Sequence, residues 1–82
     1  MFYVYLLKSD RGTMYIGYTS DLVRRVAEHK NRSVFFTKRH KRWDLVYYEA
    51  YLTKAAAQDR ERKLKQYGSA YHGLLRRVDE NR

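Results

Sequence analysis

Five side chains of this sequence could together hydrolyse a phosphodiester bond. They are Tyr5, Tyr15, Arg25, His29 and Glu61. This reaction needs a group that takes a proton from water, a cation that stabilises the developing negative charge, and a group that orients the phosphate. Arginine suits the last role because its planar guanidinium donates two hydrogen bonds to phosphate oxygens at once. A tyrosine, whose ordinary pKa is about 10, needs nearby positive charge to act as a base.

Glu61 is the most unusual of the five residues. It lies between Ala57 and Leu64 at helical spacing, on the stripe of its helix that should be buried. A carboxylate in that place is costly unless it is paired or binds a cation. The simpler interpretation is an ion pair with Lys65, four residues later on a solvated face. The sequence taken alone favours this ion pair.

The other four residues also have simpler structural interpretations. Tyr5 and Tyr15 could be core aromatics in a chain with nine tyrosines. Arg25 could pair with Asp21, and His29 is a residue that the dipole favours at the end of a helix. The case for chemistry rests on the joint arrangement, because all five side chains could converge on one face of a sheet.

The hydrophobic pattern predicts six elements in the order ββαβαα. The expected strands are 2–8, 13–19 and 43–51, and the expected helices run from a cap at 19 or 20 to about 30, over about 54–67, and from 69 to about 78. Tandem repeats, low-complexity segments and proline linkers are absent from the sequence. We therefore expect a single domain spanning residues 1–82, of class α+β.

Alternation along the strands predicts which residues share a face. Tyr3 and Tyr5 should lie on one face of the first strand, and Tyr15 and Gly17 on one face of the second. A glycine inside a strand often marks a place where a backbone or a ligand comes close, so Gly17 is a candidate contact for nucleic acid. The third strand should place four residues on one side: Leu45, Tyr47, Glu49 and Tyr51.

Polar residues and glycine mark the expected ends of the helices. Thr19 or Ser20 should cap the first helix, and Thr53 the second. Gly68 should end the second helix as its left-handed residue, and Ser69 should cap the third.

The balance of charge predicts a polyanionic partner. Lys and Arg number 18 against 9 Asp and Glu, which gives a formal net charge of +9. Between Arg24 and Arg42 the sequence has a single acid, Glu28, within an excess of basic residues. We expect residues 31–42 to form a basic loop that buries Phe35 or Phe36. Its candidate phosphate contacts are Lys38, Arg39, Lys41 and Arg42.

Composition also excludes several classes of protein. Without cysteine, the chain has neither a disulfide framework nor a thiolate zinc site, and its three histidines are scattered. No apolar run approaches the length of a membrane helix, and the first residues lack the pattern of a signal peptide. We therefore expect a cytoplasmic protein with no membrane partner.

The motifs resemble those of the GIY-YIG nuclease superfamily. They are "YVY" at 3–5, "YIG" at 15–17, "SDLVRRVAEH" at 20–29 and "AAAQDRERKLK" at 55–65. Over residues 2–67 the chain is similar to small standalone members, which are related to the N-terminal domain of the bacterial excision-repair nuclease. The resemblance implies a three-stranded antiparallel sheet flanked by helices and a divalent-metal-dependent DNA endonuclease that uses Mg²⁺ or Mn²⁺. It also implies a role in DNA repair.

The resemblance implies a role for each of the five residues. Tyr5 matches the tyrosine that activates water, and Tyr15 the tyrosine of the second motif. Arg25 matches the essential arginine that would clamp the phosphate, and His29 a position where relatives have His or Tyr. Glu61 matches the single glutamate that binds the metal, which reverses the preference for an ion pair.

The sequence departs from the family at Tyr18, where the repair nucleases have Lys, and this departure favours weak activity. The alternative is a non-catalytic module with the same fold that binds DNA or RNA through phosphate contacts. The third hypothesis is a protein-interaction domain with a tyrosine-rich surface. The sequence does not indicate which protein such a domain would bind.

Overall fold

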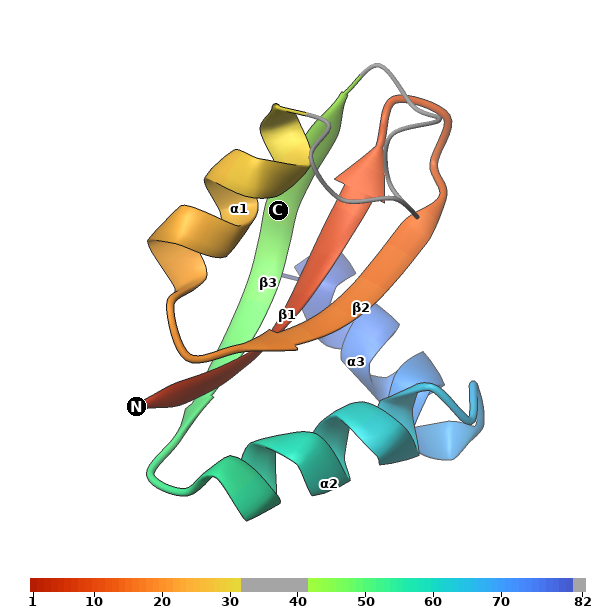
Figure 1. Cartoon of the computed structure of the whole chain (residues 1–82). Helices are drawn as coiled ribbons and strands as arrows, with labels where there is room; N and C mark the ends of the chain where they lie inside the picture. The colour runs from red at the N-terminus through yellow and green to blue at the C-terminus, as the bar shows by residue number, and fades with distance from the viewer. Residues whose placement is uncertain (32–41, 81–82) are drawn as a thin grey trace.

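A computed structural model of the chain describes residues 1–31 and 42–80. Within these residues the elements are β1 (Phe2–Ser9), β2 (Met14–Thr19), α1 (Leu22–Lys30), β3 (Trp43–Tyr51), α2 (Lys54–Leu64) and α3 (Ser69–Glu80). The strands form one antiparallel sheet in the order β2-β1-β3 (Figure 1). The expected α+β class and the order ββαβαα are confirmed. Of the basic loop, Phe35, Phe36, Lys38, Arg39 and Lys41 lie outside the described residues.

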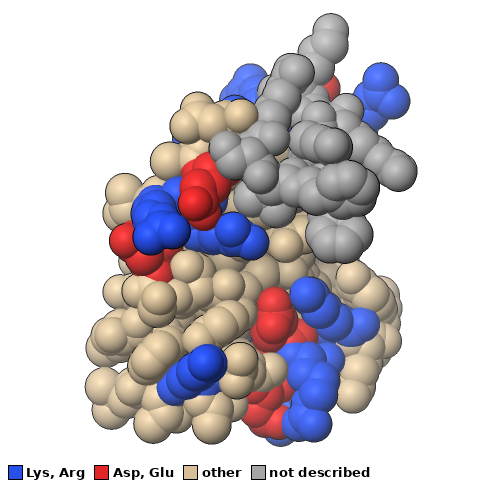
Figure 2. Space-filling view, in the orientation of Figure 1, with Lys and Arg blue, Asp and Glu red and all other residues tan. Residues whose placement is uncertain are grey.

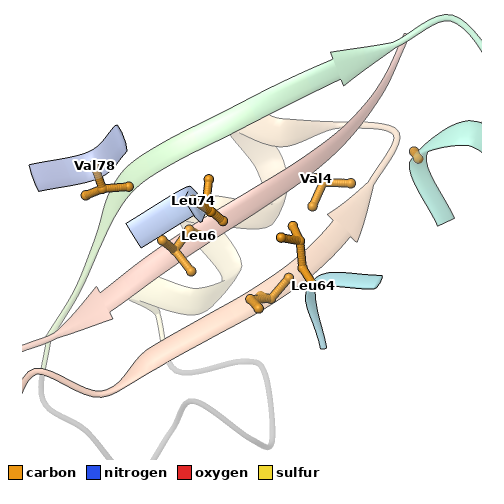
Figure 3. Close-up of a cluster of buried hydrophobic side chains, with 7 residues drawn as sticks. Val4, Leu6, Leu64, Leu74 and Val78 are labelled. Atoms are coloured by element: carbon orange, nitrogen blue, oxygen red, sulfur yellow. The ribbon is translucent and has the colours of Figure 1, made fainter. Parts of the chain in front are cut away.

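The two faces of the sheet carry different side chains. On one face, Val4, Leu6 and Ile16 form a core with α2 and α3, which contribute buried residues such as Leu64 and Leu74 (Figure 3). On the other face a second cluster contains Tyr5, Leu7 and Trp43, against which Tyr15 and, from α1, Leu22 pack. The period-two alternation of β1 is therefore confirmed, and the tyrosine face is the face that α1 covers.

The register of β1 and β3 contains an irregularity that alternation alone does not predict. Leu6 is paired with Tyr47, whereas Leu7 is paired with Leu45, so β3 has one extra residue between the two pairs. Such a bulge shifts the following side chains to the opposite face. The expectation that Leu45 shares a face with Tyr47 is therefore wrong.

The N-cap of the first helix lies one residue after Ser20, the later of the two expected caps. Asp21, with an extended backbone, is the N-cap residue, and its carboxylate accepts a hydrogen bond from the backbone N–H of Arg24 at 3.2 Å. Thr19 supports this turn, because its Oγ1 accepts a hydrogen bond from the N–H of Asp21 at 3.0 Å. An aspartate is as good a cap as serine, which explains why the sequence did not distinguish them.

The second helix ends earlier than predicted. Thr53 caps it as expected, accepting from the N–H of Ala56 at 3.2 Å, but the helix stops at Leu64. The left-handed residue is Tyr67, with φ of 56°, and not Gly68. The third helix begins its hydrogen bonding at the carbonyl of Gly68, which accepts from His72 at 3.0 Å.

An ion pair fastens α2 to the sheet. The guanidinium of Arg60 donates two hydrogen bonds to the carboxylate of Glu49 on β3, at 2.9 and 3.1 Å. The hydroxyls of Tyr47 and Tyr51 donate to the same carboxylate at 2.9 and 2.6 Å. Burial acts to raise the pKa of Glu49, but the hydrogen bonds outweigh it and leave the pKa below its ordinary value. This pair fixes the rotation of the helix that carries Glu61.

None of the helices among the described residues has the length and apolar character needed to cross a membrane.

Candidate active site

A buried hydrogen bond between Tyr5 and His29 forms the centre of the site. The phenol oxygen of Tyr5, on β1, lies 2.8 Å from Nε2 of His29, near the end of α1. Both residues are only 1% exposed. A polar pair at this depth is stable because each group satisfies the other, which is the condition for burying polar atoms.

The hydrogen bond is possible because the facing residue on β2 is a glycine. Gly17 lies directly opposite Tyr5 in the ladder, and a Cβ at Gly17 would lie 2.3 Å from both Cζ and the phenol oxygen of Tyr5. The ring of Tyr5 therefore lies over the backbone of β2. Contact between Gly17 and nucleic acid stays a prediction, whereas the structure gives this glycine a role in admitting the ring.

Replacing Gly17 with alanine is therefore expected to displace the Tyr5 ring, because the ring is buried and its hydroxyl is held by His29. Overpacking of this kind costs about 1 to 3 kcal/mol, which urea unfolding measures. The matched control is Gly73→Ala in α3, where an added Cβ meets nothing within 4 Å. That change should raise the free energy of unfolding by about 0.5 to 1 kcal/mol. Equal destabilisation by the two substitutions would contradict this account.

Tyr15 completes an aromatic cluster around the buried pair. Its ring centroid lies 4.9 Å from that of His29 and 6.3 Å from that of Tyr5. It also contacts Trp43 edge to face at 6.3 Å. These contacts hold the imidazole ring in place and exclude water from it. Tyr15 therefore packs as a core aromatic, and a part in the reaction stays a prediction.

Arg25, on α1, acts on the phenol of Tyr5 against the larger effect of burial, because its positive charge lowers the pKa that burial raises. Its partner in an ion pair is Glu28, at 3.2 Å, and not the predicted Asp21, whose carboxylate caps the helix. Glu28 also pairs with Arg24 at 3.5 Å. The hydrogen bond from Arg25 is the first cause that holds the pKa of Glu28 below its ordinary value. A phosphate that binds Arg25 must compete with this carboxylate.

Glu61 lies at the margin of the buried stripe of α2, as its spacing predicted. Ala57 and Leu64 on either side are buried, while the side chain of Glu61 is 23% exposed. Its carboxylate accepts an ion pair from Lys65 at 3.3 Å, which is the simpler contact that the sequence had suggested. Burial is the main cause that raises the pKa of Tyr5, and the charge of the Glu61 carboxylate adds a minor effect in the same direction.

The five residues do not lie on one face of the sheet, which corrects the expectation. Tyr5, Tyr15, Arg25 and His29 lie on the α1 side, and Glu61 comes from a helix that packs against the opposite face. The Tyr5 ring lies against Gly17 on β2, an edge strand that α2 also contacts.

Burial keeps the central pair in its uncharged forms. Desolvation is the largest effect on Tyr5 and raises its pKa to about 12, although the interaction with Arg25 acts in the opposite direction. Desolvation also lowers the pKa of His29 to about 4, and the positive charge of Arg25 adds to this effect. At neutral pH the site therefore holds a phenol and a neutral imidazole.

A hollow of about 280 Å³ has Arg25 in its lining. It is lined by the end of β2 and the first turns of α1, with side chains that include Tyr18, Arg24, Arg25 and Glu28. Figure 2 shows charged side chains gathered over α1 and, separately, over α2, with uncharged surface between the two groups. Both groups contain acids as well as bases, which form ion pairs within each helix.

Sequence reasoning missed Glu28 as part of the site. The available signal was spacing, because Glu28 lies four residues after Arg24 and three after Arg25, and residues so spaced are neighbours on a helix.

Arg42 is the one predicted phosphate contact of the basic loop that lies within the described residues. It is exposed and pairs with Asp44 at 3.1 Å. No group of three or more His, Cys, Asp or Glu side chains among residues 1–31 and 42–80 could hold a metal ion.

Comparison with known proteins identifies the family. The GIY-YIG catalytic domain matches residues 1–72. This chain belongs to the GIY-YIG family. The match begins before the first motif and ends beyond Glu61, so this GIY-YIG domain contains all five candidate residues.

The similar proteins are small, like this GIY-YIG chain. A UPF0213 protein of Staphylococcus epidermidis is 39% identical over 66 residues, which cover 79% of this chain and 80% of the relative. A UPF0213 protein of Haloquadratum walsbyi is 36% identical over 66 residues, covering 79% and 74%. The solution NMR structure of a UPF0213 protein from Bacillus halodurans aligns with a TM-score of 0.58 at 29% identity, covering 95% of this chain and 85% of that one.

Proposed function

We propose that this GIY-YIG protein is a metal-dependent endonuclease that hydrolyses phosphodiester bonds of DNA. The buried hydrogen bond between Tyr5 and His29, beside Arg25, is the observation that supports this proposal most strongly. A module that only binds nucleic acid has no need for a desolvated proton acceptor at this place. Similarity to the domain of a repair nuclease favours a role in DNA repair.

The protonation states favour a relay in which Tyr5 is never a free phenolate. In the tautomer that carries its hydrogen on Nδ1, the neutral His29 accepts the phenol hydrogen at Nε2. As Tyr5 passes this proton to His29, its oxygen takes a proton from the attacking water. The water oxygen forms a bond to phosphorus, the bond to the leaving oxygen breaks, and that oxygen takes a proton from solvent. Tyr15 holds the imidazole in place.

Arg25 is the group we assign to the phosphate. Its side chain is 37% exposed, so it can reach a ligand in the hollow while it remains beside Tyr5. The guanidinium group of Arg25 would then donate hydrogen bonds to phosphate oxygens in place of its contact with Glu28. The excess of basic residues adds affinity that depends on salt and is independent of base sequence.

Glu61 is the residue we assign to a divalent cation, Mg²⁺ or Mn²⁺. The donor is a single, partly exposed carboxylate, and it pairs with the flexible side chain of Lys65. This donor set fits a hard cation that keeps most of its waters, as Mg²⁺ does, and does not fit a closed cage. When bound, such a cation would neutralise negative charge on the phosphate oxygens.

Cleavage of labelled duplex, single-stranded and branched DNA tests this function. With Mg²⁺ or Mn²⁺ we expect cleavage of at least one substrate, and with EDTA none. Arg25→Ala should reduce cleavage by about 10- to 100-fold, since a charged hydrogen-bonding partner of the phosphate is lost. Arg62→Ala, which removes an exposed arginine of α2, is the matched control. DNA binding without cleavage on any substrate would favour the non-catalytic module.

A further inference from the structure

A second hollow, of about 330 Å³, lies at the first turn of α1. Its aromatic wall is formed by Tyr3 on β1 and Tyr48 on β3, and Leu22 and Val23 of α1 also line it. The two tyrosine rings meet nearly edge to face, with centroids 6.1 Å apart and an interplanar angle of 66°. The contact with Tyr3 positions the ring of Tyr48. Because Tyr48 is 54% exposed, its ring is still open to a ligand.

This aromatic hollow is close to the candidate active site. Tyr48 is the direct cross-strand partner of Tyr5, and Tyr3 lies two residues from Tyr5 on the same face. The aromatic hollow also shares Ser20 and Asp21 with the hollow that contains Arg25. One molecule could therefore occupy both hollows, with its anionic part at Arg25 and a flat apolar part at Tyr48.

A nucleotide in a single strand has this combination of parts. The bases of a duplex are stacked inside it, so only an unpaired base can reach a ring on the protein surface. Stacking on an exposed aromatic side chain is a common way to bind such bases, and it tolerates every base because each has a flat face. The size of the hollow lies at the lower end of ligand pockets, which range from about 300 to 1,000 Å³.

We propose that the Tyr3 and Tyr48 hollow is a subsite for one unpaired nucleobase, next to the phosphate that Arg25 binds. The proposal rests on the proposed function for the position of that phosphate, and it narrows the substrate to single-stranded DNA or to branched DNA with an unpaired nucleotide beside the cut. The charge of the neighbouring arginines favours a nucleic acid over a second copy of this basic chain.

Fluorescence anisotropy in EDTA tests the subsite without cleavage. The probes are a short labelled single strand, the same strand with abasic residues at its centre, and a duplex of equal length. The wild type should bind the intact strand about 5- to 50-fold more tightly than the abasic strand, as stacking of one base predicts. Tyr48→Ala should lose this difference, and Tyr48→Phe should keep it. Tyr67→Ala, at an equally exposed tyrosine of the turn after α2, should also keep it.

Each result separates the subsite from the proposed function. If the wild type binds both strands equally, or if Tyr48→Ala keeps the difference, the subsite is wrong even when the protein cleaves DNA. A base-dependent difference that Tyr48→Ala removes, in a protein that never cleaves, supports the subsite and contradicts the endonuclease. Light scattering that shows a dimer in the wild type and a monomer in Tyr48→Ala would overturn the proposal and assign the hollow to an interface between copies.

Discussion

Replacing Tyr5 with phenylalanine is expected to lower the rate of DNA cleavage by about 10² to 10⁴, the usual contribution of a positioned proton-transfer group. Phenylalanine keeps the ring over Gly17 but removes the oxygen that contacts Nε2 of His29 at 2.8 Å. Binding of DNA should change little, because Arg25 and the basic surface remain. Single-turnover cleavage of labelled DNA, with affinity measured separately in EDTA, gives the two quantities.

The control for this substitution is Tyr51→Phe on β3. It also removes a tyrosine hydroxyl that donates a hydrogen bond, at 2.6 Å to Glu49, but on the face of the sheet covered by α2 and α3. Each change should cost about 1 to 3 kcal/mol of stability, because a buried or half-buried acceptor loses a hydrogen bond. Only Tyr5→Phe should impair cleavage. Equal loss of cleavage in both variants would assign the effect to folding.

Glu61→Gln is expected to lower metal-dependent cleavage by about 10² or more, because the amide removes the negative charge that would hold the cation. The side chain keeps its size and its place at the margin of α2, so the fold should be retained. The concentration of Mg²⁺ or Mn²⁺ needed for half-maximal cleavage should rise. A titration of cleavage against each metal, for wild type and variant, measures this shift.

Asp59→Asn provides the matched control on the same helix. Asp59 is an exposed acid that pairs with Lys63 at 3.0 Å. It is not among the charged groups that shift the pKa of Tyr5. It should leave the metal dependence unchanged. If Glu61→Gln and the wild type cleave equally at every metal concentration, the carboxylate does not hold the cation, and the observed cleavage comes from another site or a contaminant.

Much of the architecture follows from local patterns in the sequence. Alternation in β1 separated the tyrosine face from the core face, and the place of Glu61 between two buried residues of α2 was visible as helical spacing. The exact cap of α1, the left-handed Tyr67 and the bulge in β3 were not predictable. Each of them is decided by small energy differences between neighbouring residues or by pairing with a distant strand.

The sequence indicates which residues are candidates for the site, but not how they are arranged. Spacing placed Arg25 and His29 on one side of a helix, but burial of His29 depends on packing against the tyrosine face. The strand pairing explains why position 17 must be a glycine, because it places this residue directly opposite the ring of Tyr5. The sequence alone does not give this register. The position of Glu61 likewise depends on the place of α2, which tertiary contacts with β2 and β3 determine.

The dependence of the single-turnover cleavage rate on pH tests the central claim most directly. Burial raises the pKa of Tyr5 to about 12 and lowers the pKa of His29 to about 4. Between these two pKa values Tyr5 is a phenol and His29 is a neutral imidazole. A relay that starts from these forms predicts a rate that is nearly constant from roughly pH 5.5 to 9 and declines only as His29 gains a proton near pH 4. A rate that rises about tenfold per pH unit across this range would show that a deprotonated form, a phenolate or hydroxide, is the reactive species, and it would contradict the relay.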